Sequence, residues 1–107
     1  MSAKVASAIV VSALVRRVNA EGGNAAIMAK GDPVSGAIML ICCDKGILQS
    51  VRERVLGHDG AYAWIAVGPT EETELSAYLQ RRRDRDPDLW LVELDVANAE
   101  RLAADMA

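Results

Sequence analysis

The sequence predicts an α+β fold, in which residues 1–107 form a single domain with an antiparallel meander sheet of about five strands and helices packed on one face. Three observations lead to this prediction. Apolar residues near the start recur with helical spacing, four strand-like runs follow with only short turns between them, and a charged segment with a proline separates a second helix from a fifth strand. The predicted order of elements is α-ββββ-α-β-α.

The first predicted helix covers Ser7 to Ala20. Four of its apolar residues recur at i, i+3, i+4 and i+7 and therefore share one face. They are Val11, Leu14, Val15 and Val18. Glu21-Gly22-Gly23 ends the helix. Because β-branched residues lower helix propensity, an alternative stays open in which Val5 to Val11 forms a short strand before a shorter helix.

Four strands are predicted next, at Asn24–Lys30, Gly36–Cys43, Ile47–Leu56 and Ala61–Val67. The segments between them are short and rich in glycine and aspartate, which is typical of turns between antiparallel neighbours. The second run is apolar almost throughout and is predicted to be covered on both faces, whereas the third is mixed and half-exposed. In the fourth run, Trp64 is either a core residue or the rim of a groove.

A second helix is predicted to begin at Glu71, with Thr70 as its cap. Acidic residues at its start and arginines at its end match the helix dipole, which explains much of the charge pattern. Pro87 disfavours helical geometry at the residue before it and so marks the helix exit.

The alternation of apolar and polar residues from Leu89 to Val96 predicts a fifth strand that returns to the same sheet. Asn98 is predicted to cap a short final helix, in which Leu102 and Met106 are spaced by one turn. No repeat or second domain is indicated.

Composition limits the classes of function. A net charge of -3 gives no global attraction to nucleic-acid phosphates. The apolar run at Ala8–Val15 is too short to cross a bilayer, and Arg16-Arg17 interrupts what would otherwise resemble a secretion signal. Adjacent Cys42 and Cys43 would point to opposite faces of a strand, so neither a disulfide framework nor a metal site is expected, and buried thiols are inert. We expect a cytoplasmic protein.

Four stretches of the chain resemble a small bacterial family catalogued as domain of unknown function 1491. They are residues 11–18, the Lys30-Gly31-Asp32 turn with Gly36-Ala37, residues 52–64 and residues 81–93. The most specific piece is Asp86-Pro87-Asp88-Leu89-Trp90, which follows the arginines. The resemblance implies a family without an assigned activity, so it carries over no catalytic residues.

The surplus of arginines after the second helix is the main candidate for a binding surface, because guanidinium groups match carboxylate and phosphate oxygens. Interleaved aspartates favour a solvated helix end instead. Arg16 and Arg17 of the first helix can join this surface only if the two helices end on the same side of the molecule. The candidate binding residues are Arg16, Arg17, Arg81, Arg82, Arg83 and Trp90.

Other candidates for chemistry are weaker. His58 is predicted at an exposed hairpin tip, away from any nucleophile. Carboxylates that a hard cation might use are not gathered by their spacing and include Asp32, Asp86, Asp88, Glu93 and Asp95. We expect no cofactor and no metal.

The function expected from the sequence is that of a non-enzymatic interaction or accessory module, which recognises an unknown protein partner through the arginine-rich surface. The first alternative is nucleic-acid or nucleotide binding through the same arginines, with Tyr62 or Trp64 stacking on a base. The net acidity of the chain disfavours it. A metal-assisted hydrolase using Asp86, Asp88 and Glu93 is the last alternative. A homodimer through an edge strand, such as Asn24–Lys30 or Ile47–Leu56, is also expected.

Overall fold

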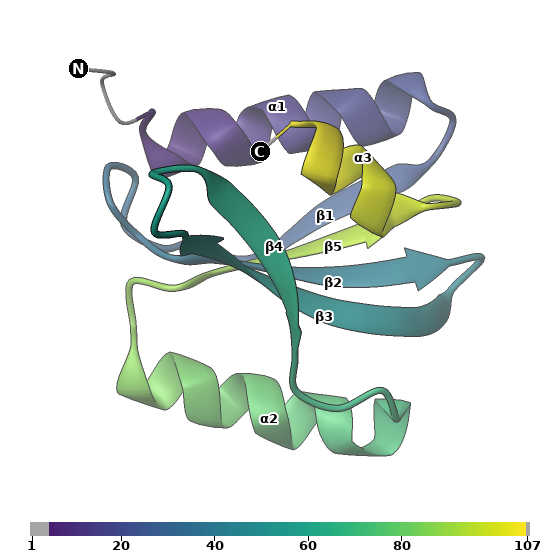
Figure 1. Cartoon of the computed structure of the whole chain (residues 1–107). Coiled ribbons are helices and arrows are strands. Elements are labelled where there is room, and N and C mark those ends of the chain that lie inside the picture. Colours follow the sequence, from purple (N-terminus) through teal and green to yellow (C-terminus); the bar gives the residue numbers. More distant parts are fainter. Residues whose placement is uncertain (1–4, 107) are drawn as a thin grey trace.

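The computed structural model, which describes residues 5–106, contains one five-stranded sheet with helices on both of its faces (Figure 1). The elements are α1 (Ser7–Ala20), β1 (Asn24–Ala29), β2 (Ile38–Asp44), β3 (Ile47–Leu56), β4 (Tyr62–Val67), α2 (Glu72–Arg85), β5 (Trp90–Asp95) and α3 (Ala99–Asp105). The α+β class, the number of strands and the element order predicted from the sequence are confirmed.

Helix α1 has the predicted bounds, and the alternative of a strand at residues 5–11 is wrong. Val11, Leu14 and Val18 are buried on its inner face, and burial of these side chains outweighs the small propensity cost of β-branching. The Ser7 hydroxyl donates a 2.6 Å hydrogen bond to the Gly36 carbonyl. This buried bond fixes the start of α1 on the segment that leads into β2.

The strand order of the sheet is β1-β5-β2-β3-β4. Strands β2, β3 and β4 form the predicted antiparallel meander, but β1 does not pair with β2. Strand β5 lies between them, antiparallel to β1 and parallel to β2. The reason is burial: Leu91, Val92 and Leu94 of β5 are almost fully buried, so this strand takes an interior position, while the small residues of β1 suit an edge.

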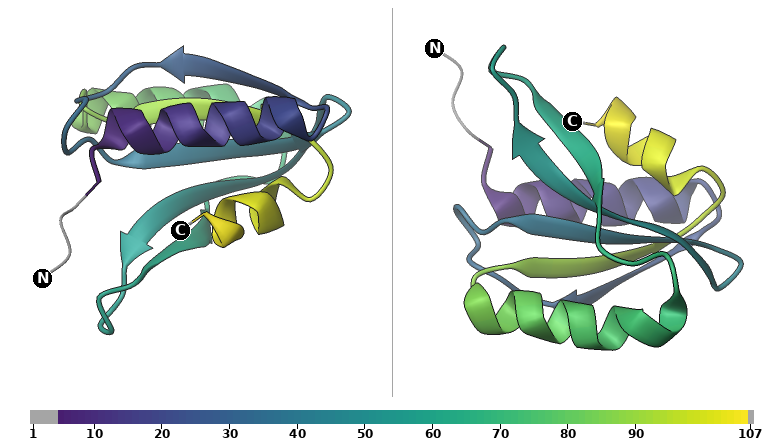
Figure 2. Two further views of the ribbon diagram at one scale, coloured as in Figure 1. Left: turned by 90° about the horizontal axis from the view of Figure 1, so that it is seen from above. Right: turned by 60° about the horizontal axis from the view of Figure 1, so that its bottom comes forward.

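The prediction that all helices pack on one face is wrong. Helices α1 and α3 cover one face, and α2 covers the other (Figures 1 and 2). Strand β2 explains this arrangement, because Leu40 faces α1 and α3 whereas Met39 and Ile41 face α2, and all three are buried. A strand that is apolar on both faces requires cover on both. The apolar pattern of β2 therefore favours helices on both faces of the sheet over helices on one face.

The predicted side-chain caps do not form. The N-cap of α2 is Glu71 instead of Thr70, and it makes no side-chain cap bond. Asn98 does stand at the N-cap of α3, but in a left-handed conformation with φ 58° and without a side-chain bond. None of the helices within residues 5–106 combines the length and apolar character needed to cross a membrane.

Candidate functional site

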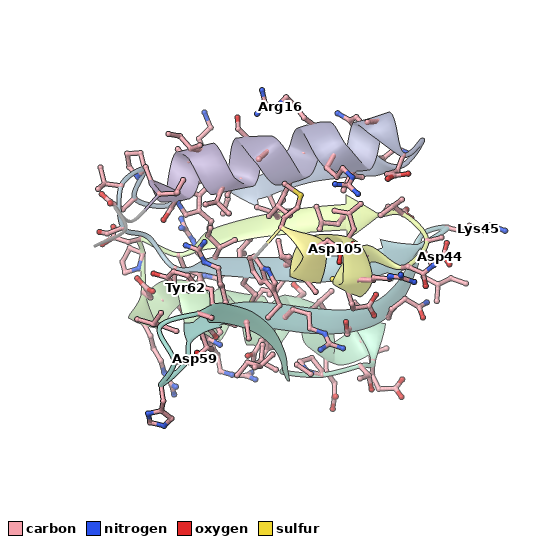
Figure 3. The ribbon with its side chains drawn as sticks, turned by 45° about the horizontal axis from the view of Figure 1, so that its top comes forward. Arg16, Asp44, Lys45, Asp59, Tyr62 and Asp105 are labelled. Carbon is pink, nitrogen blue, oxygen red and sulfur yellow. The ribbon has the colours of Figure 1, made fainter. Side chains whose placement is uncertain are left out.

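The arginines singled out in the sequence do not converge. Arg16 and Arg17 lie on α1, and Arg81, Arg82 and Arg83 lie on α2, on the opposite side of the sheet (Figure 1). Figure 3 shows Arg16 on the outer side of α1, directed away from the sheet. The five side chains therefore form no common pocket.

Arg82 is engaged within the molecule. Its Nη2 donates a 2.7 Å hydrogen bond to Glu53 Oε1 on β3, and its Nη1 donates to the Tyr78 hydroxyl at 2.9 Å. Desolvation opposes its charge, but the bonds to Glu53 and Tyr78 outweigh that effect and raise the pKa of Arg82 above its ordinary value. This guanidinium joins α2 to the sheet and is not available to an external anion in this geometry.

Arg83 closes the junction between α2 and β5. Its Nη1 donates to the carbonyl oxygens of Leu89 at 2.6 Å, Pro87 at 2.8 Å and Lys30 at 3.2 Å. These carbonyls belong to the turn around Pro87 and to the segment after β1. The role of Arg83 is therefore to brace backbone, which the sequence alone does not reveal because Lys30 is 53 positions away.

Trp90 is part of the same junction and not of a surface. Its side chain is buried, and its indole Nε1 donates a 2.8 Å hydrogen bond to the Asp32 carbonyl. The Asp32 amide in turn donates to the Asp88 carbonyl at 3.0 Å, and a Cβ on Gly31 or Gly36 would collide with that same carbonyl. Two of the stretches that resemble the family, residues 30–37 and residues 86–90, thus meet in one tight structural contact.

The Asp32 carboxylate organises the loop before β2. Its Oδ2 accepts hydrogen bonds from the amides of Ser35 at 2.8 Å and Val34 at 3.1 Å. The Ser35 bond is the main cause that holds the pKa of Asp32 below its ordinary value. Asp86 acts similarly in the next turn, where its Oδ1 accepts from the Asp88 amide at 3.2 Å. Both carboxylates have structural partners.

The remaining sequence candidates for chemistry stay apart. His58 is exposed in the turn between β3 and β4, next to Asp59, which Figure 3 shows at the tip of the hairpin. Within residues 5–106, no group of three or more histidine, cysteine or acidic residues is placed to hold a metal ion. Burial raises the pKa of Cys42 to about 12 and of Cys43 to about 11, with nearby carboxylates adding to both shifts. The two thiols lie on opposite faces of the sheet, as predicted.

The aromatic residues of β4 are not an open stacking platform. Trp64 packs half-buried against the core beneath α1 and α3, which answers the open question of its position. Its Nε1 is buried and has no hydrogen-bond partner among residues 5–106. The guanidinium of Arg54 lies 4.2 Å from the centre of the Tyr62 ring. One face of Tyr62 is therefore already covered.

A groove between β1 and α2 is the feature that the sequence analysis missed. A groove of about 600 Å³ lies between α2 and the edge strand β1. Its apolar lining consists of Met28, Ala29, Leu75, Leu79 and Leu91. Its polar lining consists of Glu72, Ser76, Gln80 and Arg83. The nearest signal in the sequence is the uncharged run Asn24–Ala29, which indicates an edge strand but no groove.

Strand β1 is one margin of the sheet, as the left view of Figure 2 shows. It pairs with β5 alone, and Ala26, Ile27 and Met28 are exposed. Of the two edges expected from the sequence, Asn24–Lys30 is therefore correct. The alternative edge Ile47–Leu56 is wrong, because β3 lies between β2 and β4.

Comparison with known proteins agrees with this fold. The family model described as a protein of unknown function, DUF1491, matches residues 5–104. A crystal structure of a DUF1491 family protein from Caulobacter crescentus CB15 shares 30% identity over 92% of this chain and 94% of its own, with a TM-score of 0.82. An NMR structure of a DUF1491 family protein from the same organism shares 30% identity over 94% of both chains, with a TM-score of 0.79.

A third similar structure is the solution structure of protein Atu0922 from A. tumefaciens, with 29% identity over 90% of this chain and 89% of its own and a TM-score of 0.73. No curated protein matches the chain. These relatives support the architecture and carry no activity over to it.

Proposed function

Because the chain belongs to the DUF1491 family, whose function is unknown, we propose from its own geometry that it is a non-enzymatic interaction module, which binds an extended protein segment in the groove beside β1. The observation that carries this proposal is the position of the groove. It follows a sheet edge on one side and a helix on the other.

An extended segment suits such a place for a physical reason. The outer side of β1 presents backbone amides and carbonyls that pair with no strand within residues 5–106, and an added strand can bond to them along its length. Every second side chain of that added strand would point toward the α2 face of the sheet. Met28 of β1, which is exposed, and Leu75 of α2, which is half-buried, offer apolar contacts beside the groove.

The arginine-rich surface expected from the sequence finds less support than the groove. Arg82 and Arg83 are bonded inside the molecule, and Arg17 pairs with Glu21 at 3.2 Å. Arg16 and Arg81 are exposed but lie on opposite faces. We therefore keep the proposed role of interaction module and place the contact on β1. We also propose a cytoplasmic location, with which two free buried thiols are compatible.

Nucleic-acid binding gains no support from the geometry. It requires clustered cations and open aromatic faces, whereas the arginines are divided between two faces and Arg54 covers Tyr62. The net charge of -3 also opposes it.

Selection of displayed random peptides on the immobilised protein tests the proposal. We expect enriched sequences that alternate apolar and polar residues, and we expect their affinity to fall at least about tenfold in Met28→Asp, since one lost well-placed apolar contact is worth about 1.4 kcal/mol or more. Val34→Asp is the matched control, because Val34 is also an exposed apolar residue but lies outside the groove. Equal binding of the peptides to both variants would contradict the proposal.

A further inference from the structure

We infer that the protein segment bound beside β1 is basic, and that it carries a lysine or arginine whose charge lies at Glu93 and Glu72. This inference rests on the proposed function, because it names the chemistry of the segment that the same groove receives. It is supported by a group of carboxylates that no cation of the chain balances, and by an open route to them over the edge strand.

Three carboxylates lie together at the end of the groove where α2 begins. Glu93 and Asp95 follow Leu91, a residue that lines the groove, at every second position of β5, so they share its face of the sheet. Glu72 of α2 lines the groove itself. Desolvation raises the pKa of Cys43 to about 11, and the charges of Glu93, Asp95 and Glu72 add to this shift. All three carboxylates therefore lie near one thiol.

These carboxylates form no ion pair in the part of the chain that the structure describes, where the two ion pairs involve other residues. Asp95 accepts a hydrogen bond from the Gly46 amide at 2.9 Å, and Glu72 accepts one from the Leu48 amide at 3.3 Å. No hydrogen bond from within residues 5–106 reaches the side chain of Glu93, which is half-buried. A half-buried carboxylate is stabilised by a donor of opposite charge.

The basic residues beside this face are directed elsewhere. Arg83 lines the opposite end of the groove, and its Nη1 donates to the carbonyls of the junction between α2 and β5. Lys45 lies in the turn after β2, and Figure 3 shows its side chain directed away from the sheet. A basic residue of the bound segment can supply the missing charge, so the groove favours a basic partner over an acidic one.

Strand β1 leaves a route to Glu93 open. Its partner on β1 is Ala26, which is exposed and has only a methyl side chain. A strand added to β1 would lie two strand spacings, about 10 Å, from β5. The long stem of a lysine or arginine can extend over Ala26 toward the carboxylate, whereas a short polar side chain is too far away.

The bulge between Ile27 and Ala29 limits where the segment can pair, because a bulge interrupts regular pairing and protects that end of an edge strand. The regular part of β1 begins at Asn24 and lies beside the carboxylates. Met28 and Leu75 offer apolar contacts next to it. Side chains two positions apart in an extended segment share a face at a distance of about 7 Å. We therefore expect a basic residue two positions from an apolar one.

Binding of three defined pools of short peptides to the immobilised full chain tests the inference. All pools carry apolar residues on one face of the extended peptide and uncharged polar residues on the other. One position between two apolar residues on the first face is fixed as lysine, as glutamine or as glutamate. We expect the lysine pool to bind at least about tenfold more tightly than the glutamine pool, and the glutamate pool to bind most weakly.

Glu93→Gln should abolish the preference for the lysine pool and leave binding of the glutamine pool unchanged. Glu74→Gln is the matched control, because Glu74 is an exposed acidic residue of α2 outside this groove and its substitution changes the net charge equally. In the natural chain, a higher salt concentration should reduce the preference for lysine, and this measurement requires no variant.

Equal binding of the lysine and glutamine pools to the natural chain overturns the inference, as does a preference for lysine that survives Glu93→Gln. If the pools still bind in these cases and Met28→Asp weakens them, the proposed function stands without the inference. Binding of no pool overturns both.

Discussion

The indole Nε1 of Trp90 donates a 2.8 Å hydrogen bond to the carbonyl of Asp32, a residue 58 positions earlier in the chain. The bond lies where the segment between β1 and β2 crosses the start of β5. A side chain on Gly31 would collide there with the Asp88 carbonyl and the Trp90 ring, so the close approach requires glycine. The family-like segments at residues 30–37 and 86–90 are thus two sides of one structural contact.

Removal of the Trp90 hydrogen bond should lower stability. We expect Trp90→Phe to reduce the free energy of unfolding by about 1–3 kcal/mol, because the variant removes the shorter of the two hydrogen bonds to the Asp32 carbonyl, which keeps only the Gly36 amide at 3.2 Å, and creates a small void. Urea denaturation measures this change. Trp64→Phe is the matched control, because the Trp64 Nε1 has no partner in the part of the chain that the structure describes, so its loss removes no hydrogen bond there. A loss in the control that equals the loss at Trp90 would contradict the role of the bond.

The arginines of α2 should differ sharply in their effect on stability. Arg83 bonds to three backbone carbonyls, and Arg83→Ala should cost about 1–3 kcal/mol of unfolding free energy. Arg81 is exposed, and Arg81→Ala should change the free energy of unfolding by no more than about 0.5 kcal/mol. Thermal unfolding of both variants compares two neighbouring arginines of one helix end. Similar losses in the two would show that Arg83 does not brace the junction.

The ion pair between Arg82 and Glu53 should contribute a measurable coupling energy. Both side chains are about three-quarters covered, at 26% and 22% exposure, so we expect about 1 kcal/mol from a double-mutant cycle with alanine. The pair between Arg17 and Glu21 is exposed at 45% and 52% and should give only about 0.3–0.5 kcal/mol. A weaker coupling in the Arg82 pair than in the Arg17 pair would contradict the proposed bridge from α2 to β3.

The buried thiols should make the protein less stable at alkaline pH. An ordinary cysteine has a pKa of 9.0, whereas burial raises the pKa of Cys42 to about 12 and that of Cys43 to about 11. Below pH 9 both thiols are protonated in the folded and the unfolded chain, and their contribution to stability is fully present. Above pH 9 the unfolded chain releases protons that the folded chain retains, so this contribution falls by up to about 1.4 kcal/mol per thiol and pH unit until the folded pKa is reached.

Urea unfolding curves measured between pH 8 and the raised pKa of Cys42, about 12, check this prediction, because they give the free energy of unfolding at each pH. The double variant Cys42→Ala, Cys43→Ala is the reference, since lysine and tyrosine side chains also titrate there. The natural chain should lose stability more steeply than the variant. A thiol reagent at neutral pH should label neither cysteine before unfolding.

The sequence indicated the elements well because their signals are local. The spacing of Val11, Leu14 and Val18 determines the buried face of α1, and the helix has the predicted bounds. The same reasoning placed all five strands to within a few residues and identified β2 as covered on both faces. Caps were predicted less well, since neither Thr70 nor Asn98 makes the expected side-chain bond. A cap depends on local backbone geometry that residue type alone does not specify.

The sequence by itself determined which residues form helices and strands and which of their faces are apolar, because a period of 3.6 or 2 residues is a property of the chain. Only the tertiary structure decided how β1 and β5 join the predicted meander of β2, β3 and β4. Pairing of β5 between β1 and β2 joins segments far apart in sequence, and burial of β5 selects it. That same placement leaves β1 at the edge beside a groove, while the packing of α1 and α2 on opposite faces separates Arg16 from Arg81. The candidate site therefore follows from strand order, which no local pattern encodes.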